Sequence, residues 1–277
     1  MRTTDGSMAM GIMNGAVVGA GIPDLPLLDR RIVVTRARSQ ADELSRRLRE
    51  AGADAIEMPM IRFHAFGHPS QHQSTIHRLD EFDWIVFSSG NAISYFLELI
   101  QEADIPHGVR LACVGKHSAE VLSRHGLEPD FVPQQFSGHQ LAAQLPLDTG
   151  QKVLCPGPTE IASGLVESLQ SRGAIVERLP IYETVSNELT AGQLQRLESK
   201  IDGITFASPS AVDSFCQQVQ HHTMLSPGCV IACIGPTTGQ KARELGLNVD
   251  IVPQQYSIPG LVKALVQYFA DAGERHG

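Results

Sequence analysis

Short apolar runs alternate with amphipathic segments along most of the chain. Ile32–Thr35 is short and rich in β-branched residues, which is typical of a buried strand. The next segment, Ser39–Glu50, carries its apolar side chains at helical spacing and stops before Gly52. Further expected strands and helices follow in the same order: Ile85–Phe87, Ala92–Ile100, Leu111–Val114, Ser118–Arg124, Phe131–Val132 and His139–Gln144. Strict alternation of strands and helices predicts an α/β fold, with parallel sheets covered by helices on both faces.

The chain also repeats itself. Leu111–Gly115 matches Ile231–Gly235, and Phe131–Ser137 matches Ile251–Ser257, with both pairs offset by 120 residues. Two further pairs match in the same order: Arg31–Arg36 with Lys152–Gly157, and Asp83–Ser89 with Asp202–Ser208. The order and the regular spacing indicate two copies of one structural unit.

Two apolar runs, each broken by one proline, interrupt the alternation. They are Met58–Phe63 and Leu179–Thr184, and their prolines lie 121 residues apart. Proline cannot donate to a sheet ladder, so it belongs at strand starts or edges. We interpret both runs as extended segments that cross between two lobes. The periodicity leaves a second arrangement open, in which each copy forms its own lobe and the prolines lie inside the lobes.

The crossing interpretation places the first strand and helix in the same lobe as the end of the chain. It predicts an N-terminal extension at 1–27, a discontinuous lobe 1 at 28–57 plus 185–270, lobe 2 at 64–177, and linkers at 58–63 and 178–184. The extension is glycine-rich and only weakly hydrophobic, which predicts disorder rather than an export signal.

Composition narrows the possible functions. The 277 residues carry a formal charge of −8, which argues against a nucleic-acid-binding surface. The five cysteines are scattered without a CxxC motif, which predicts neither a zinc site nor a disulfide framework, and therefore a reducing compartment. Cys113 and Cys233 occupy matching apolar runs and are expected in the core. No apolar run is long enough to span a bilayer.

Four histidines could suggest a metal site, and one cysteine could suggest a nucleophile. For each we prefer an interpretation without a catalytic or metal-binding role. His64, His68, His72 and His77 fall in one polar stretch, which we expect to be a solvated loop rather than a metal site. Cys155 precedes Pro156 at a strand end, where no neighbouring base is indicated.

An ordered set of segments carries a family resemblance. The segments are VTRARSQADELSRRLREAGA, FSSGNAISYF, CVGKHSAEVLSRHG, LPIYET, FASPSAVDSF and CIGPTTGQKARELGL. Together they resemble uroporphyrinogen-III synthases, from about Arg31 to Phe269. The resemblance implies two parallel-sheet α/β lobes of flavodoxin-like topology, joined by a two-stranded β-ladder, and so favours the crossing interpretation.

The resemblance also implies an activity. It indicates a lyase that cyclises the linear tetrapyrrole hydroxymethylbilane to uroporphyrinogen III, with inversion of ring D and loss of water. The resemblance implies no cofactor and no metal. From the charge and the lack of a long apolar run, we expect neither a nucleic-acid nor a membrane partner, and we expect a cytoplasmic monomer. A non-catalytic two-lobed domain that binds a small anion or regulates is the alternative from a different class.

The substrate implied by the resemblance is polyanionic, so an acidic protein must offset that charge locally. Strand-to-helix loops can do this, because helix N-termini present free N–H groups and glycine allows close approach. The expected substrate-binding residues are Arg36, Ser88, Ser89, Asn91, Gly115, Ser118, Ser208, Ser210, Gly235, Thr237 and Thr238. The serines and threonines have an alternative role as ordinary N-caps. Ser118 stands where the family more often has threonine, and Ala207 where a hydroxyl is common.

Tyr182 is the expected catalytic residue. A positioned phenol could protonate the hydroxyl that leaves ring A of the substrate. The twin segment has Ile61 in place of a tyrosine, which favours a specific role. The alternative is a half-buried strand tyrosine with no chemical part.

Overall fold

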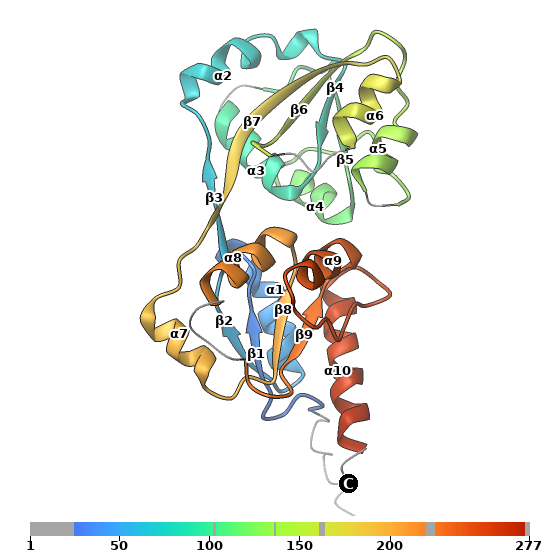
Figure 1. The fold of residues 1–277 in the computed structure, drawn as a ribbon. Coiled ribbons are helices and arrows are strands. Elements are labelled where there is room, and N and C mark those ends of the chain that lie inside the picture. Colours follow the sequence, from blue (N-terminus) through green and yellow to red (C-terminus); the bar gives the residue numbers. More distant parts are fainter. Residues whose placement is uncertain (1–24, 102–103, 136, 161–163, 220–224, 275–277) are drawn as a thin grey trace, which may run out of the picture.

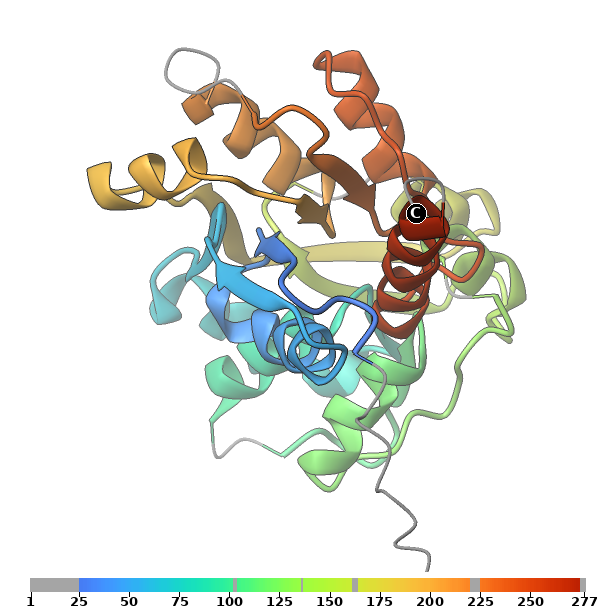
Figure 2. The same ribbon diagram turned by 90° about the horizontal axis from the view of Figure 1, so that it is seen from below.

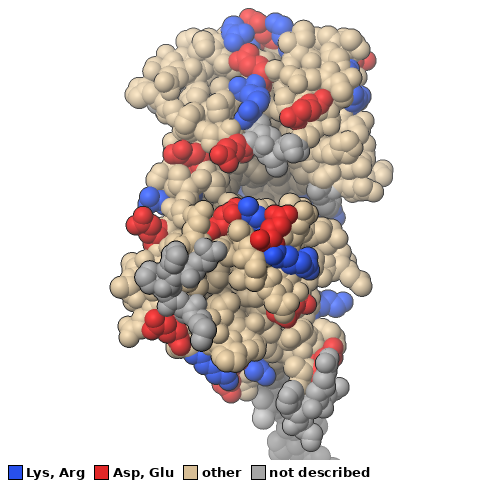
Figure 3. All heavy atoms as spheres, viewed as in Figure 1, with Lys and Arg blue, Asp and Glu red and all other residues tan. Residues whose placement is uncertain are grey.

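The computed structural model describes residues 25–101, 104–135, 137–160, 164–219 and 225–274. These residues form two α/β lobes that lie end to end (Figure 1). The space-filling view shows a waist between the lobes, with charges of both signs interspersed on the face in view (Figure 3).

The lower lobe in Figure 1 contains a four-stranded parallel sheet. In spatial order its strands are β2 (Asp54–Glu57), β1 (Arg31–Val34), β8 (Gly203–Phe206) and β9 (Val230–Cys233). Its helices are α1 (Arg38–Glu50), α7 (Ala191–Glu198), α8 (Pro209–Val219), α9 (Pro236–Glu244) and α10 (Ile258–Glu274). Because strand side chains alternate, Val33 and Phe206 pack toward α8, while Ile32 and Val34 pack toward α1 and α10. The view from below shows the two helix layers on opposite faces of this sheet (Figure 2).

The upper lobe contains a five-stranded sheet in which only one edge strand is antiparallel. In spatial order its strands are β3 (Ile61–Ala65), β7 (Ile175–Ser186), β6 (Lys152–Pro158), β4 (Trp84–Phe87) and β5 (Arg110–Cys113). Its helices are α2 (Pro69–Ile76), η1 (Leu79–Glu81), α3 (Gly90–Ile100), α4 (Lys116–Arg124), α5 (Gly138–Gln144) and α6 (Leu165–Ser171). Ile85 and Phe87 pack with α3 and α4, whereas Trp84 and Val86 pack with α5 and α6.

Each sheet is built from both sequence copies. In the lower sheet β1 pairs with β8, and in the upper sheet β4 pairs with β6. The chain therefore leaves the lower lobe after β2 and returns after β7, as in the crossing arrangement that the repeat left open. The exact lobe boundaries given above stay a prediction.

The two lobes are connected by an antiparallel pair of strands, β3 and β7, which is the β-ladder that the resemblance implies. Their register runs from Ile61 opposite Ser186 to Ala65 opposite Tyr182. β7 is a single strand of 12 residues that also pairs in parallel with β6. It therefore begins three residues before the expected linker at 178–184 and ends two residues after it, with Pro180 inside the strand. The register of β6 shifts at Gly157, opposite Pro180, which has no N–H to donate.

Two local predictions are wrong. The strand expected at Phe131–Val132 is only an isolated bridge to Ala112, because Pro133 follows at once and cannot extend the ladder. The histidine stretch is not a solvated loop. It contains the end of β3 and all of α2, and His72 is buried, with Nε2 3.0 Å from the Phe66 carbonyl oxygen.

Most of the expected N-terminal extension, residues 1–24, lies outside the described residues. Its last residue, Leu27, is fully buried in the cluster formed with α1 and α10, and its N–H donates to the Ala51 carbonyl at 2.9 Å. The packed lower lobe therefore begins before residue 28. Across the described ranges, no helix combines the length and apolarity needed to cross a bilayer.

Matching aspartates join neighbouring strands in the two lobes, so the duplication extends to single hydrogen bonds. Asp202 Oδ2 accepts from the Arg31 N–H at 2.9 Å, and its twin Asp83 accepts from the Lys152 N–H at 2.8 Å. Asp202 is only 7% exposed. Its loss would leave a partly buried N–H without a partner, which costs roughly 1–3 kcal/mol.

We therefore expect Asp202→Ala to lower the free energy of unfolding by about 2 kcal/mol in urea denaturation. Asp80→Ala, at an exposed position in η1, is the matched control and should change the stability by less than ~0.5 kcal/mol. Equal losses for both variants would contradict a role for the Asp202 carboxylate in joining the strands.

Candidate functional site

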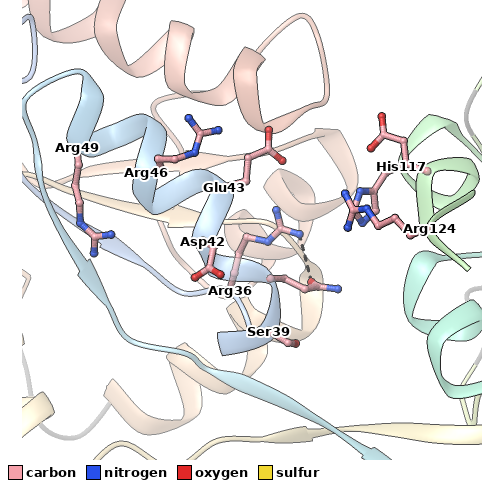
Figure 4. A pocket seen from close by; sticks show the side chains of 10 residues that line it. Arg36, Ser39, Asp42, Glu43, Arg46, Arg49, His117 and Arg124 are labelled. Carbon is pink, nitrogen blue, oxygen red and sulfur yellow. Dashed lines mark hydrogen bonds between the residues drawn. The ribbon is translucent and has the colours of Figure 1, made fainter. Parts of the chain in front are cut away.

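Three hollows meet around the start of α1, between the two lobes. The largest, the α1–α4 groove, is open, encloses about 720 Å³ and is lined by Arg36, Ser39, Gln40, Asp42, Glu43, Arg46, Arg49, His117, Glu120 and Arg124 (Figure 4). The α1–α3 groove, of about 520 Å³, shares Ser39, Gln40, His117 and Arg124 with it and adds Phe63, Asn91 and Tyr95 among others. A smaller α1–α8 hollow of about 220 Å³ contains Arg36, Ser208 and Ser210. The site therefore draws on loops that follow strands of both sheets, as expected for open α/β sheets.

Four arginines and three carboxylates line the α1–α4 groove. Arg46 and Arg49 are already paired with glutamates of the lower lobe. Arg36 and Arg124 have no carboxylate oxygen within 4 Å anywhere in the described ranges. Two guanidinium groups of this groove are therefore available to an anion.

Arg36 is the better defined of the two. Its Nη2 donates to Gln40 Oε1 at 3.3 Å, and its buried Nε has no hydrogen-bond partner among the described residues. Burial lowers the pKa of Arg36, an effect that Glu43 partly opposes. A desolvated cation with an unused donor is poised to bind a carboxylate, to which a guanidinium can donate two parallel hydrogen bonds.

The helix N-termini at the site fall into two kinds. Ser89 Oγ accepts from the Ala92 N–H at 3.2 Å, and Ser208 Oγ accepts from the Ala211 N–H at 3.2 Å. Both serines are thus N-caps, the alternative considered for them from the sequence. By contrast, no side chain caps α1, α4 or α9 within the part of the chain that the structure describes. Their first N–H groups and positive dipole ends remain open to an anion.

The structure brings together some of the expected binding residues and separates others. Arg36, Asn91, Ser208 and Ser210 line at least one of the three hollows. The remaining expected residues line none of them: Ser88, Ser89, Gly115, Ser118, Gly235, Thr237 and Thr238. The side chains of Ser118 and Thr238 are buried, because each falls on the inward face of the first helical turn. Only backbone roles remain open for these two in this conformation.

Tyr182 lies one ring behind the α1–α3 groove. It is 5% exposed, stacked on Tyr95 with ring centroids 5.1 Å apart, and in edge contact with Phe63 at 5.9 Å. Both neighbours line the groove. The Tyr182 hydroxyl lies 3.3 Å from Ser89 Oγ, and burial raises the pKa of the phenol above its ordinary 10.0. The group is therefore a fully protonated phenol at neutral pH.

Sequence reasoning missed several residues that line the grooves. Gln40 Nε2 donates to Asn91 Oδ1 at 2.9 Å, a direct side-chain bond between the two lobes. His117 and Arg124 lie seven residues apart, which places them on one face of α4. This seven-residue spacing is visible in the sequence, but the position of α1 across the groove from α4 is not.

The cysteines and the possible metal ligands are further candidate functional groups. All five cysteines are free, and burial raises the pKa of Cys155 to about 12, so a thiolate is not available at neutral pH. Cys113 and Cys233 are fully buried, which confirms their expected place in the core. Among the described side chains, no group of three or more histidine, cysteine, aspartate and glutamate residues could hold a metal ion.

Comparisons with known proteins point to one family. Residues 42–263 match the family described as Uroporphyrinogen-III synthase HemD. The chain is 31% identical over 260 residues to the uroporphyrinogen-III synthase of Synechococcus elongatus, covering 88% of this chain and 97% of the relative. It is 30% identical to the chloroplastic uroporphyrinogen-III synthase of Oryza sativa subsp. japonica, covering 88% of this chain and 82% of that one.

Solved structures share the fold at lower identity. The uroporphyrinogen-III synthetase of Helicobacter pylori superposes with a TM-score of 0.62 at 19% identity, covering 86% of this chain and 99% of that one. A mutant uroporphyrinogen III synthase of Thermus thermophilus gives a TM-score of 0.60 at 17% identity, covering 89% and 99%.

Proposed function

The chain belongs to the uroporphyrinogen-III synthase family, and from this premise we propose that it cyclises hydroxymethylbilane to uroporphyrinogen III. The reaction inverts ring D and releases water, which makes the enzyme a lyase of tetrapyrrole biosynthesis. We further propose that it acts as a monomer without metal or cofactor. Its five free thiols favour a reducing compartment such as the cytoplasm.

One observation carries the proposal: an open interlobe groove with two guanidinium groups that lack carboxylate partners among the described residues. Hydroxymethylbilane bears an acetate and a propionate arm on every ring, so it presents carboxylates along its whole length. Arg36 and the uncapped start of α1 lie at one wall of this groove. They supply the charge-assisted and backbone hydrogen bonds that carboxylates prefer.

Positioning is the main part of the mechanism. The bilane must curl so that ring D attacks through its substituted carbon and forms a spiro intermediate. Holding two reacting ends of one chain in register removes much of the entropic barrier, and effective molarities of about 10⁵–10⁸ M are reached in well-oriented systems. Contacts to carboxylates from both lobes would hold the chain in this shape.

Tyr182 would assist the first step by donating a proton to the departing hydroxyl. Because Tyr95 covers its ring, the Tyr182 hydroxyl would reach the α1–α3 groove when Tyr95 turns aside. Its hydrogen-bond partner Ser89, at 3.3 Å, lines none of the three hollows and would hold the hydroxyl in place.

Isomer analysis tests the function. The protein is incubated with enzymatically generated hydroxymethylbilane, and the oxidised products are separated by chromatography. We expect the type III isomer in excess of the type I isomer that forms spontaneously, with heat-denatured protein as the control. Only type I product would support the alternative, a non-catalytic domain that binds an anion.

A further inference from the structure

We propose that Arg124 on α4 is a second carboxylate-binding residue, so that both lobes hold one polycarboxylate ligand at the same time. The inference rests on the proposed function and assigns the upper-lobe half of the binding site. Arg36 supplies the lower-lobe half, and the two lie on opposite walls of the α1–α4 groove (Figure 4).

The surroundings of Arg124 show why its charge is available. The guanidinium has no hydrogen bond or ion pair with any side chain in the described ranges. Glu120 lies one turn earlier on the same helix, the usual spacing for a helical ion pair, yet its carboxylate is not within 4 Å. Arg124 instead lines both the α1–α4 groove and the α1–α3 groove.

Neighbouring groups strengthen the assignment. His117 lies two turns before Arg124 on the same helix face and lines the same two grooves, which adds a hydrogen-bond donor. The N-terminus of α4 begins after Gly115 without a described side-chain cap, so its dipole also favours an anion on this side. The groove also has three acidic side chains, Asp42 and Glu43 on α1 and Glu120 on α4. They would repel a ligand carboxylate elsewhere in the groove and so favour its binding at the arginines.

A ligand with carboxylates spread along it can use both walls, whereas a single carboxylate uses one. The bound chain would then hold the lobes together, in parallel with the Gln40–Asn91 hydrogen bond. Removing Arg124 should weaken binding of the long ligand while leaving the chemistry of the bound state largely intact. This predicts a change in KM rather than in kcat.

The test compares Arg124→Gln, Arg124→Lys and the control Arg196→Gln, an exposed arginine on α7 that lines none of the three hollows. The readouts are KM and kcat for hydroxymethylbilane and the Kd of uroporphyrin I, an unreactive octacarboxylate, measured by fluorescence. We expect Arg124→Gln to raise KM and Kd about five- to tenfold, with kcat changed less than twofold. Its Kd should also rise less steeply with salt, while Arg124→Lys recovers part of the affinity.

Unchanged KM and Kd in Arg124→Gln, or the same shift in Arg196→Gln, would overturn the proposal. The outcome is separable from the isomer test, because uroporphyrin I binding does not require turnover. Wild-type protein that makes no type III isomer but binds uroporphyrin I through Arg124 would sink the proposed function and keep this inference.

Discussion

Tyr182→Phe is expected to lower kcat for type III product at least several-fold, and up to the 10²–10⁴-fold typical of general acid catalysis. The substitution removes only the hydroxyl, whose one hydrogen-bond partner among the described side chains is Ser89. The ring contacts with Tyr95 and Phe63 remain, so the fold should stay intact. Initial rates of isomer formation, with circular dichroism as the check on folding, measure the effect.

A matched control is Tyr268→Phe, a partly exposed tyrosine on α10 that lines none of the three hollows of the site. It should leave kcat unchanged. Undiminished kcat in Tyr182→Phe would remove this residue from the mechanism and leave positioning as the whole of the catalysis.

The pH dependence follows from the same side chain. Burial raises the pKa of Tyr182 above 10.0, and the protonated phenol is the form that donates. Activity that depends on it is therefore complete at lower pH and is lost only as the pH rises through the raised pKa. We therefore expect that ionisation of Tyr182 causes no decline in kcat between pH 7 and 9. A pH–rate profile tests this: a decline in the wild type that is absent in Tyr182→Phe would contradict it.

Arg36→Met is expected to have two effects: weaker substrate binding and higher stability of the fold. Loss of a partly buried guanidinium that binds a carboxylate should raise KM by about tenfold or more, since hydrogen bonds to charged groups contribute roughly 1.5–3 kcal/mol. The same change removes a desolvated charge whose Nε has no described partner, and replaces it with a shorter, unbranched apolar chain. We expect the melting temperature to rise by about 2 °C.

Opposite signs for affinity and stability distinguish a binding role from a structural one. Arg196→Met, on the exposed surface of α7, should change neither KM nor melting temperature appreciably. A lower melting temperature in Arg36→Met with unaltered KM would show that Arg36 supports the fold and does not bind substrate.

Local signals in the chain predicted most of the elements and their order, with the strand at Phe131–Val132 and the loop at the histidine stretch as the exceptions. The β-branched run of β1, the helical spacing within α1 and the glycines that follow the helices gave boundaries within a residue or so of those observed. The repeat predicted equivalent elements, and the structure extends that equivalence to the twin aspartates Asp83 and Asp202. The family resemblance supplied the β-ladder, and with it the function, neither of which spacing alone could reach.

Partners across the molecule came only from the folded chain. Periodicity predicts that β1 is a strand but does not predict its partner. The pairing of β1 with β8 joins residues about 170 apart in the sequence, so it depends on how the whole lobe packs. The same reason hid half of the site: Arg36 was expected to bind substrate, but Arg124 was not, because only the folded chain brings α1 and α4 face to face across a groove. It also hid the burial of Tyr182, since the Tyr95 ring that covers it arrives from another element. The residues near one another in the sequence determine whether each segment forms a helix or a strand. Long-range packing determines which distant side chains come together, and the proposed site is built from such side chains.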